Sequence, residues 1–282
     1  MIIDFHTHIF SPAVIRARSD YAATDPCFGE LYSSPRAKMA TAEELVAAMD
    51  EAGIAVSVAL NIGWADQDLC RQTNDYLLEA AARFAGRLVA FCAVQPRAGE
   101  SALREVERCA RAGARGIGEM RPDAQGFDLR DGDLMPVLAD VLARHNMVFL
   151  THASEPVGHA YPGKGEVTPQ VIYPFIASFP SLRVVCAHWG GGLPFYALMP
   201  EVAQALANTW FDTAATPYLY RPEVFRRVAD AVGSDRVLFG SDYPLMRPER
   251  VIKQVEGADL APAEREAMLG RNAAGLLGLP VG

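Results

Sequence analysis

Four histidines stand at or near the ends of short apolar segments. His6 and His8 lie two residues apart in IIDFHTH, so on a β-strand their side chains share one face. His152 stands near the end of MVFLTHA and His188 near the end of LRVVCAHW. The apolar, β-branched character of these segments is typical of buried strands. We therefore expect four imidazoles at the ends of three strands.

Two acidic residues occupy comparable places, Glu119 in ARGIGEM and Asp242 in RVLFGSD. Each residue alone has an ordinary structural explanation, as a hydrogen-bonded core histidine or a capping carboxylate. Burying all six groups together is costly unless a cation compensates them. Imidazoles and carboxylates without thiolates suit a catalytic divalent ion, so we expect zinc, with manganese or iron as alternatives.

The elements that position these residues alternate along the whole chain. Apolar runs begin at residues 2, 55, 88, 114, 147, 182, 209 and 236. Amphipathic helical patterns lie between them at 41–53, 66–85, 100–112, 133–145, 169–179, 195–207, 222–232 and 248–256. This alternation predicts an α/β fold, a single (β/α)₈ TIM barrel over residues 1–282, with an open parallel sheet as the alternative. In the barrel, the carboxyl ends of the strands share one mouth, which would hold the metal site.

Two connections are too long to be simple turns, residues 9–40 and residues 154–168. Both follow carboxyl ends of strands, so we expect them to lie over the mouth as lids or substrate loops. His159, Tyr161 and Lys164 lie in the second connection and are candidate substrate-binding residues. A flexible exposed loop is the alternative interpretation.

Arg121 is a fourth candidate for substrate binding. It follows Glu119 by two residues, and its guanidinium could grip a carboxylate or phosphate. A salt bridge to a neighbouring acid would explain it equally well. Gly190 to Gly192 lack the spacing of a phosphate-binding loop, and we interpret them as room for the backbone beside His188.

Composition narrows the function further. The chain is 50% hydrophobic and 21% charged, as a packed globule requires, and its net charge of −8 argues against a nucleic-acid partner. Five scattered cysteines favour neither a disulfide framework nor a thiolate zinc site. With no membrane segment or targeting signal in sight, we expect a cytoplasmic protein that acts on a small molecule.

These residues and their surroundings resemble the metal-dependent amidohydrolase superfamily. The flanking segments GIGEMRP, VVCAHWGG, VLFGSDYP and GRNAAGLLGL look most like its amidohydrolase-related branch, which includes aminocarboxymuconate-semialdehyde decarboxylase-like proteins. The resemblance extends from Ile2 to Leu279. It implies that His6, His8 and Asp242 hold one ion, while His152 and His188 hold a second. It also allows a homo-oligomer.

In relatives with two ions, a carboxylate bridges them, and Glu119 stands at the corresponding position. The resemblance then implies a metal-activated water as nucleophile, with Asp242 as its proton acceptor. With one ion, the ligands would be His6, His8, His152 and Asp242, and His188 would be an acid or base. We favour two ions, because an unpaired Glu119 would repel Asp242.

The expected function is therefore metal-dependent hydrolysis of an ester, lactone, amide or related bond in a small anionic substrate. The alternative is metal-dependent nonoxidative decarboxylation of a small carboxylated substrate, with His188 supplying the proton. A barrel that binds a ligand without catalysis is the third interpretation, and the full ligand set argues against it.

Overall fold

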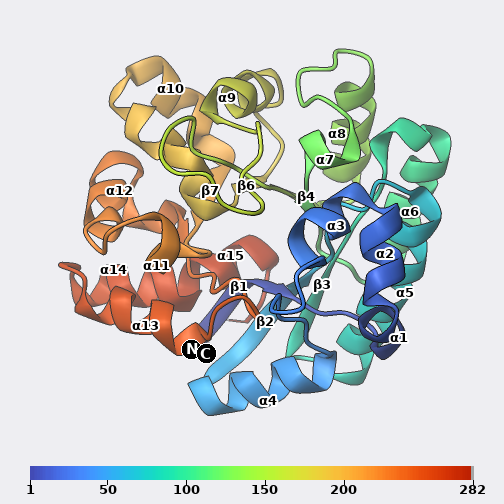
Figure 1. The fold of residues 1–282 in the computed structure, drawn as a ribbon. Helices are drawn as coiled ribbons and strands as arrows, with labels where there is room; N and C mark the ends of the chain where they lie inside the picture. The colour runs from blue at the N-terminus through green and yellow to red at the C-terminus, as the bar shows by residue number, and fades with distance from the viewer. Residues whose placement is uncertain (281–282) are drawn as a thin grey trace.

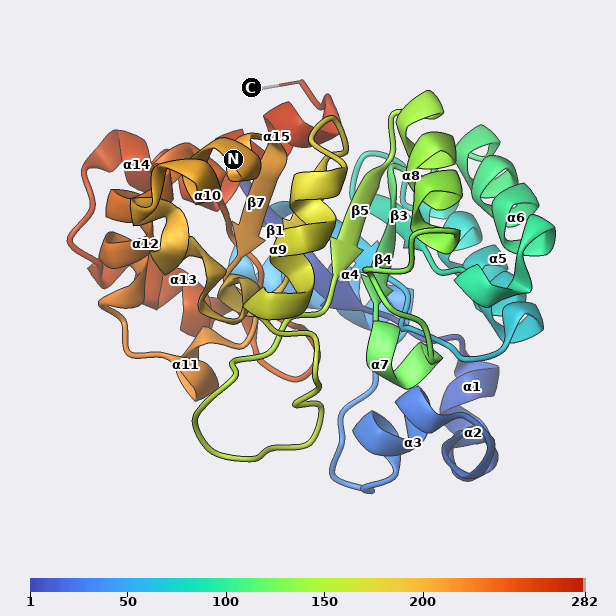
Figure 2. The ribbon, with the colours of Figure 1, turned by 90° about the horizontal axis from the view of Figure 1, so that it is seen from above.

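The computed structural model describes residues 1–280 and contains eight parallel strands in chain order. Helices surround these strands, as Figures 1 and 2 show. The predicted barrel is confirmed. The strands are β1 (Ile2–His8), β2 (Ile54–Leu60), β3 (Leu88–Cys92), β4 (Gly116–Met120), β5 (Val148–Thr151), β6 (Val184–Cys186), β7 (Thr209–Asp212) and β8 (Val237–Leu238).

Backbone hydrogen bonds between the first and last strands join the two edges of the sheet. The amide of Phe5 donates to the Phe239 carbonyl at 2.8 Å, and the amide of Asp242 donates to the His6 carbonyl at 2.9 Å. A parallel bridge joins Thr7 to Tyr243. These bonds nearly close the sheet, so the alternative of an open sheet is wrong. They also bring two candidate metal ligands, His6 and Asp242, side by side.

The predicted helices are present between the strands, with one exception at residues 195–207. There the chain forms short turns, η2 (His188–Leu198) and η3 (Leu206–Asn208), around α10 (Pro200–Ala205). Pro200 interrupts any longer helix in this segment, because proline lacks the amide donor, and α10 begins at this residue. The remaining return helices are α4 (Ala42–Ala52), α5 (Gln67–Arg83), α6 (Glu100–Arg111), α8 (Leu134–Arg144), α9 (Pro169–Ser178), α12 (Val224–Val232) and α13 (Pro248–Gly257).

Shorter elements complete the chain. They are α7 (Pro122–Gln125), α11 (Thr216–Leu219), α14 (Pro262–Glu266), α15 (Asn272–Leu277), η1 (Pro96–Ala98), η4 (Ser234–Arg236) and the π-helical turn η5 (Ala267–Arg271). Among residues 1–280, no helix combines the length and apolarity needed to cross a membrane. The five cysteines are free and buried.

Buried side chains from six strands form one apolar cluster together with α15. The cluster includes Phe5, Leu60, Phe91, Leu150 and Leu238, all with 0% exposure. Two further clusters contain residues of the strands and the outer helices. The polar ends of the strands therefore rest on a dry, closely packed layer, which limits their movement.

The long connection 9–40 is more structured than expected. It carries α1 (Pro12–Arg16), α2 (Arg18–Thr24) and α3 (Pro26–Tyr32). Ser11 and Asp25 cap α1 and α3, and each precedes a proline that suits the first helical position. Figure 2 shows these helices and the segment 154–168 projecting on the side where the strands end. Residues 154–168 contain no helix or strand.

The glycines after β6 have left-handed backbones, which they adopt without the steric cost of a side chain. Gly191 has φ +60, and an added Cβ would lie 2.2 Å from the Ser154 carbonyl oxygen. This agrees with the interpretation that the run makes room for backbone. His188 itself has φ +53, so it begins the same tight turn.

We predict that Gly191→Ala destabilises the fold much more than Gly192→Ala. Both positions have positive φ, which costs alanine about 1–2 kcal/mol. At Gly192 the nearest neighbour of the added Cβ is the Tyr220 hydroxyl, 3.8 Å away, whereas at Gly191 the added Cβ would clash with the Ser154 backbone. Overpacking should therefore cost Gly191→Ala about 1–3 kcal/mol more in the free energy of unfolding, measured by urea titration. Equal losses would contradict the contact-based explanation.

Candidate metal centre

The six candidate metal-binding residues converge at the ends of β1, β4, β5, β6 and β8. The Nε2 atoms of His6 and His8 lie 3.1 Å apart. Asp242 Oδ1 lies 3.9 Å from the first of these atoms and 3.7 Å from the second. All six residues have at most 9% exposure. The barrel thus gathers residues from opposite ends of the chain into one buried cluster.

Glu119 lies between the histidines. Its Oε1 is 2.8 Å from His152 Nδ1 and 3.3 Å from His188 Nε2. Its Oε2 is 3.8 Å from His6 Nε2 and 3.7 Å from His8 Nε2. Each carboxylate oxygen therefore faces one pair of imidazoles, which is the arrangement of a carboxylate that can serve two neighbouring cations.

The donor atoms fit a divalent cation. Three overlapping groups have ligand atoms within 4.8 Å of one another. They are His6 with His8 and Glu119, His6 with His188 and Asp242, and Glu119 with His152 and His188. Two imidazole nitrogens that face each other at 3.1 Å need either a proton or a cation between them, because two lone pairs repel. Nitrogen and oxygen donors of this kind suit zinc, manganese or iron.

The electrostatics of the cluster favour added positive charge. Burial lowers the pKa of His6, but Asp212, Glu119 and Asp242 outweigh it and raise the pKa to about 10. Burial likewise opposes protonation of His188, but Glu119 raises its pKa to about 9. Conversely, burial raises the pKa of Glu119, yet His152, His188 and His6 hold it well below its usual value.

Asp212, at the end of β7, is a site residue that the sequence analysis missed. Its Oδ2 accepts a hydrogen bond from His6 Nδ1 at 2.8 Å, and its Oδ1 accepts from the backbone amides of His188 and Ala214 at 3.0 Å each. The bond to Nδ1 leaves Nε2 of His6 free for a cation. The position of Asp212 at the end of a predicted strand, TWFD, was the available signal.

Asp4 precedes His6 by two residues in β1, so strict alternation would place its side chain on the same face as His6 and His8. It nevertheless does not contact their rings. Its Oδ1 accepts from the backbone amides of His6 at 3.2 Å and Ser241 at 2.9 Å. The register of β1 against β2 shifts between Asp4 and Thr7, and such a bulge changes which side chains share a face. Burial raises the pKa of Asp4 to about 7 despite these bonds.

His152 connects the cluster to the segment 154–168. Its Nε2 lies 3.0 Å from Ser154 Oγ, which also accepts a hydrogen bond from the Gly165 amide at 2.9 Å. If the amide supplies one hydrogen to Oγ, the Ser154 hydroxyl can donate its own to Nε2. His152 then presents an N–H at Nδ1 to Glu119. Ser154 therefore fixes the ring of His152 from outside the cluster.

The four candidate substrate-binding residues divide into two groups. Arg121 is 1% exposed, and its Nη2 donates to the Gly163 carbonyl at 3.0 Å and lies 3.3 Å from Glu30 Oε2. The other three contact their own segment instead. Tyr161 donates to Glu155, while Lys164 Nζ donates to the carbonyls of Val157 and His159.

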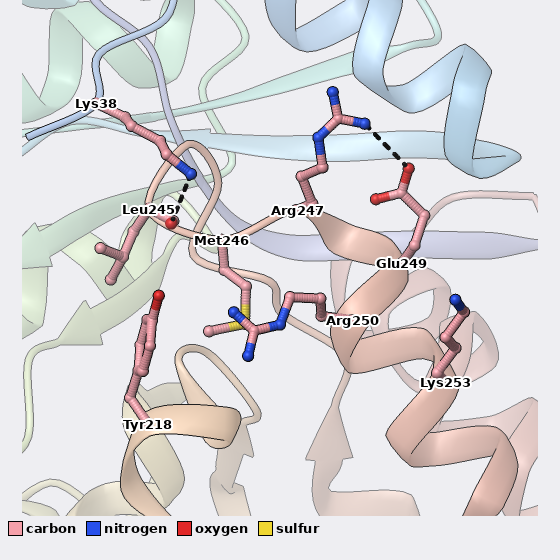
Figure 3. Close-up of a pocket in the computed structure, with 8 residues that line it drawn as sticks. All are labelled: Lys38, Tyr218, Leu245, Met246, Arg247, Glu249, Arg250 and Lys253. Carbon is pink, nitrogen blue, oxygen red and sulfur yellow. Dashed lines mark hydrogen bonds and ion pairs between the residues drawn. The ribbon is translucent and has the colours of Figure 1, made fainter.

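A separate pocket of about 480 Å³ lies beside the loop that follows Asp242 (Figure 3). The pocket shares no residue with the cluster of six. Its lining includes four cationic side chains and one acidic residue, namely Lys38, Arg247, Arg250, Lys253 and Glu249. Positive charge near the mouth favours the approach of small anions.

Comparison with known proteins identifies the class of this barrel. The Amidohydro_2 family model, described as amidohydrolase, matches residues 3–279, so the chain belongs to this family. This confirms the resemblance drawn from the sequence. Sequence identity to individual relatives is 22–26%, so the comparisons define the family more closely than the reaction.

Decarboxylases predominate among the relatives. The chain is 22% identical over 254 residues to the 2-amino-3-carboxymuconate-6-semialdehyde decarboxylase of Dictyostelium discoideum, covering 75% of this chain and 67% of that protein. It is 26% identical over 150 residues to the L-fucono-1,5-lactonase of Burkholderia ambifaria, covering 47% of each.

A solved structure has a similar fold. The 5-carboxyvanillate decarboxylase of Novosphingobium aromaticivorans, complexed with manganese and 4-hydroxy-3-methoxy-5-nitrobenzoic acid, superposes with a TM-score of 0.81. The two proteins are 19% identical, and the match covers 99% of this chain and 96% of that one. That relative binds manganese rather than the zinc we expected first, and manganese is among our alternatives.

We predict that divalent-cation affinity rises with pH. The raised pKa of His6 means that its ring is protonated at neutral pH, and a cation at Nε2 must displace that proton. At pH values below the histidine pKa, the binding constant should rise about tenfold per pH unit for each proton that the cation displaces. Competition against a fluorescent chelator, from about pH 6.5 to about pH 8.5, measures this slope. An affinity that does not change with pH would contradict the assigned electrostatics.

We also predict that Asp212→Asn weakens cation binding by about 10–100-fold. The amide nitrogen of asparagine would face His6 Nδ1 and move the ring proton to Nε2, where the cation binds. Asp4→Asn is the matched control, since Asp4 is equally buried but contacts backbone amides rather than a ring. Calorimetric titration with Mn²⁺ compares the two variants. If the two variants bind Mn²⁺ equally well, Asp212 does not contribute to cation binding.

Proposed function

We propose that this protein is a metal-dependent nonoxidative decarboxylase of a small, carboxylated aromatic or otherwise unsaturated substrate. Decarboxylases predominate among its relatives, and the neighbouring structures include complexes with small aromatic carboxylates. The observation that carries the proposal is the placement of His188. A buried, protonatable imidazole shares the cluster with the candidate metal ligands, and a buried guanidinium lies on the same strand end as Glu119.

His6, His8 and Glu119 would hold the catalytic ion, with Asp242 beside them. When bound, the cation supplies positive charge that orients the substrate carboxylate and neutralises developing negative charge. Asp212 keeps the His6 ring in the orientation that such binding needs. His152 holds Glu119 from the opposite side through the 2.8 Å contact.

His188 would supply the proton. Its Nδ1 lies 3.2 Å from the Ala214 carbonyl, and its Nε2 lies 3.3 Å from Glu119 Oε1, which raises the pKa of the ring in the cation-free protein. When the bond between the substrate carbon and its carboxyl group breaks, the electron pair stays on that carbon and carbon dioxide leaves. The Nε2 proton of His188 then passes to the carbon, which restores a neutral product.

Hydrolysis remains a second candidate, because Glu119 places one oxygen near each pair of histidines. With His6 and His8 at one ion, and with His152 and His188 at another that replaces the protons facing Glu119, the cluster would suit two cations. Cations lower the pKa of bound water, and Asp242 would accept its proton. The lactonase among the relatives is consistent with this chemistry.

The test is a direct assay of both reactions. Protein loaded with Mn²⁺ or Zn²⁺ is incubated in D₂O with 5-carboxyvanillate, with other small aromatic carboxylates and with L-fucono-1,5-lactone. We expect carbon dioxide release and one deuterium on the carbon that carried the carboxyl group. His188→Gln should lower kcat for decarboxylation by about 10²–10⁴-fold while the cation stays bound.

His145→Gln is the matched control, because His145 caps the far end of α8 and lies outside the cluster. It should leave kcat unchanged. Metal analysis accompanies the assay, and about one cation per chain is expected for the decarboxylase. Lactone opening with two bound cations and no carbon dioxide release would instead establish the hydrolase. Full activity in His188→Gln would refute the proton-donor role.

A further inference from the structure

Three residues from three different segments meet above the end of β4. Arg121 Nη2 donates to the Gly163 carbonyl at 3.0 Å, and the Gly163 amide donates to Glu30 Oε1 at 3.1 Å. Glu30 Oε2 lies 3.3 Å from Arg121 Nη2, which completes a triangle. Glu30 belongs to α3 in the connection 9–40, and Gly163 belongs to the connection 154–168. The triangle therefore joins both mouth segments to the barrel.

Arg121 has more donors than this triangle uses. Its Nε and Nη1 are buried and have no hydrogen-bond partner among residues 1–280. A buried guanidinium with unpaired N–H groups is costly, because each group loses its hydrogen bond to bulk water. Glu30 is itself partly exposed and reaches only one edge of the guanidinium. The free donors therefore indicate an acceptor that the protein itself does not provide.

Gly163 makes this close arrangement possible. Its φ of +92 favours glycine, and an added Cβ would lie 3.0 Å from Leu31 Cδ2 and 3.9 Å from Arg121 Nη1. The segment is fixed on either side of this point as well. The Gly165 amide donates to Ser154 Oγ, and the Glu166 amide donates to Asp123 Oδ2. Only residues 155–162 lie outside these anchors.

We propose that Arg121, positioned by Glu30 and the Gly163 peptide, is a subsite for a small carboxylate, and that occupancy of this subsite holds segment 154–168 closed over the mouth. The carboxylate would accept a hydrogen bond from Nη1, which has no partner in the described part of the chain. That contact fixes the guanidinium in the orientation in which Nη2 donates to Gly163. The subsite deepens the proposed function, because a decarboxylase substrate carries such a group.

Trypsin provides a test that does not depend on turnover, since Lys164 lies inside the segment. The full chain loaded with Mn²⁺ is digested with and without benzoate, and cleavage after Lys164 is followed by mass spectrometry. We expect benzoate to slow this cleavage by at least about fivefold, as closure of a locally opening segment should. Benzamide, which is uncharged and of similar shape, should give no protection.

Two variants separate the roles of the residues. Glu30→Ala should speed cleavage without ligand, yet benzoate should still protect, because Arg121 remains. Arg121→Gln should speed cleavage and abolish the protection. Glu201→Gln, on α10, is the control for the loss of one carboxylate elsewhere. Glu30 is partly exposed, so its variant should fold even if Arg121→Gln does not.

Two outcomes would overturn the proposal. One is benzoate binding, detected by calorimetry, without any protection of Lys164. The other is full protection in Arg121→Gln. Because the readout is proteolysis, a chain that is protected but releases no carbon dioxide would retain the subsite and refute the decarboxylase. Carbon dioxide release without protection of Lys164 would support the decarboxylase and refute the subsite.

Discussion

The concentration of charge at the barrel mouth is the constraint on which the rest of this structure depends. Four imidazoles and two carboxylates lie buried within a few ångströms of one another, and Glu119 contacts all four rings. Without compensation such a cluster would be expelled into water or would change its protonation. The neighbouring carboxylates raise the pKa values of His6 and His188, so protons would provide part of this compensation when no cation is bound. A divalent ion would compete directly with those protons, which links metal affinity to pH.

The surrounding architecture holds this charge in place. Below it, the apolar cluster that includes Phe5, Phe91 and Leu150 excludes water from the base of the site. Around it, groups that would not themselves bind the ion orient the rings, with Asp212 beside His6 and Ser154 beside His152. Above it, Arg121 ties both long connections to the end of β4. Each layer limits the positions that the candidate ligands can adopt, as efficient catalysis requires.

Much of the fold and the site was predictable from sequence, because strand ends in a barrel share one mouth. The six candidate ligands were found in this way, and the structure brings them together. Asp212 was overlooked because a single aspartate at a strand end resembles a common capping residue. Asp4, two residues before His6, contacts backbone amides and not the histidine rings, and the register of β1 shifts just after it. The junction of Glu30, Arg121 and Gly163 was beyond reach, since no local pattern indicates which segments meet in space. The interruption of the expected helix at 195–207 did have a signal, Pro200 in its interior.

The seam between β1 and β8 has a consequence for how the protein matures. His6 and Asp242 lie on opposite sides of that seam, and the amide of Asp242 donates to the carbonyl of His6. A chain emerging from the ribosome presents the two histidines of β1 first and Glu119 later, whereas Asp242 appears only near the end of synthesis. A cation that needs the complete cluster would thus be acquired late in biogenesis, after the last strand has docked. A prematurely terminated product would lack the complete cluster, however well its earlier helices and strands had formed.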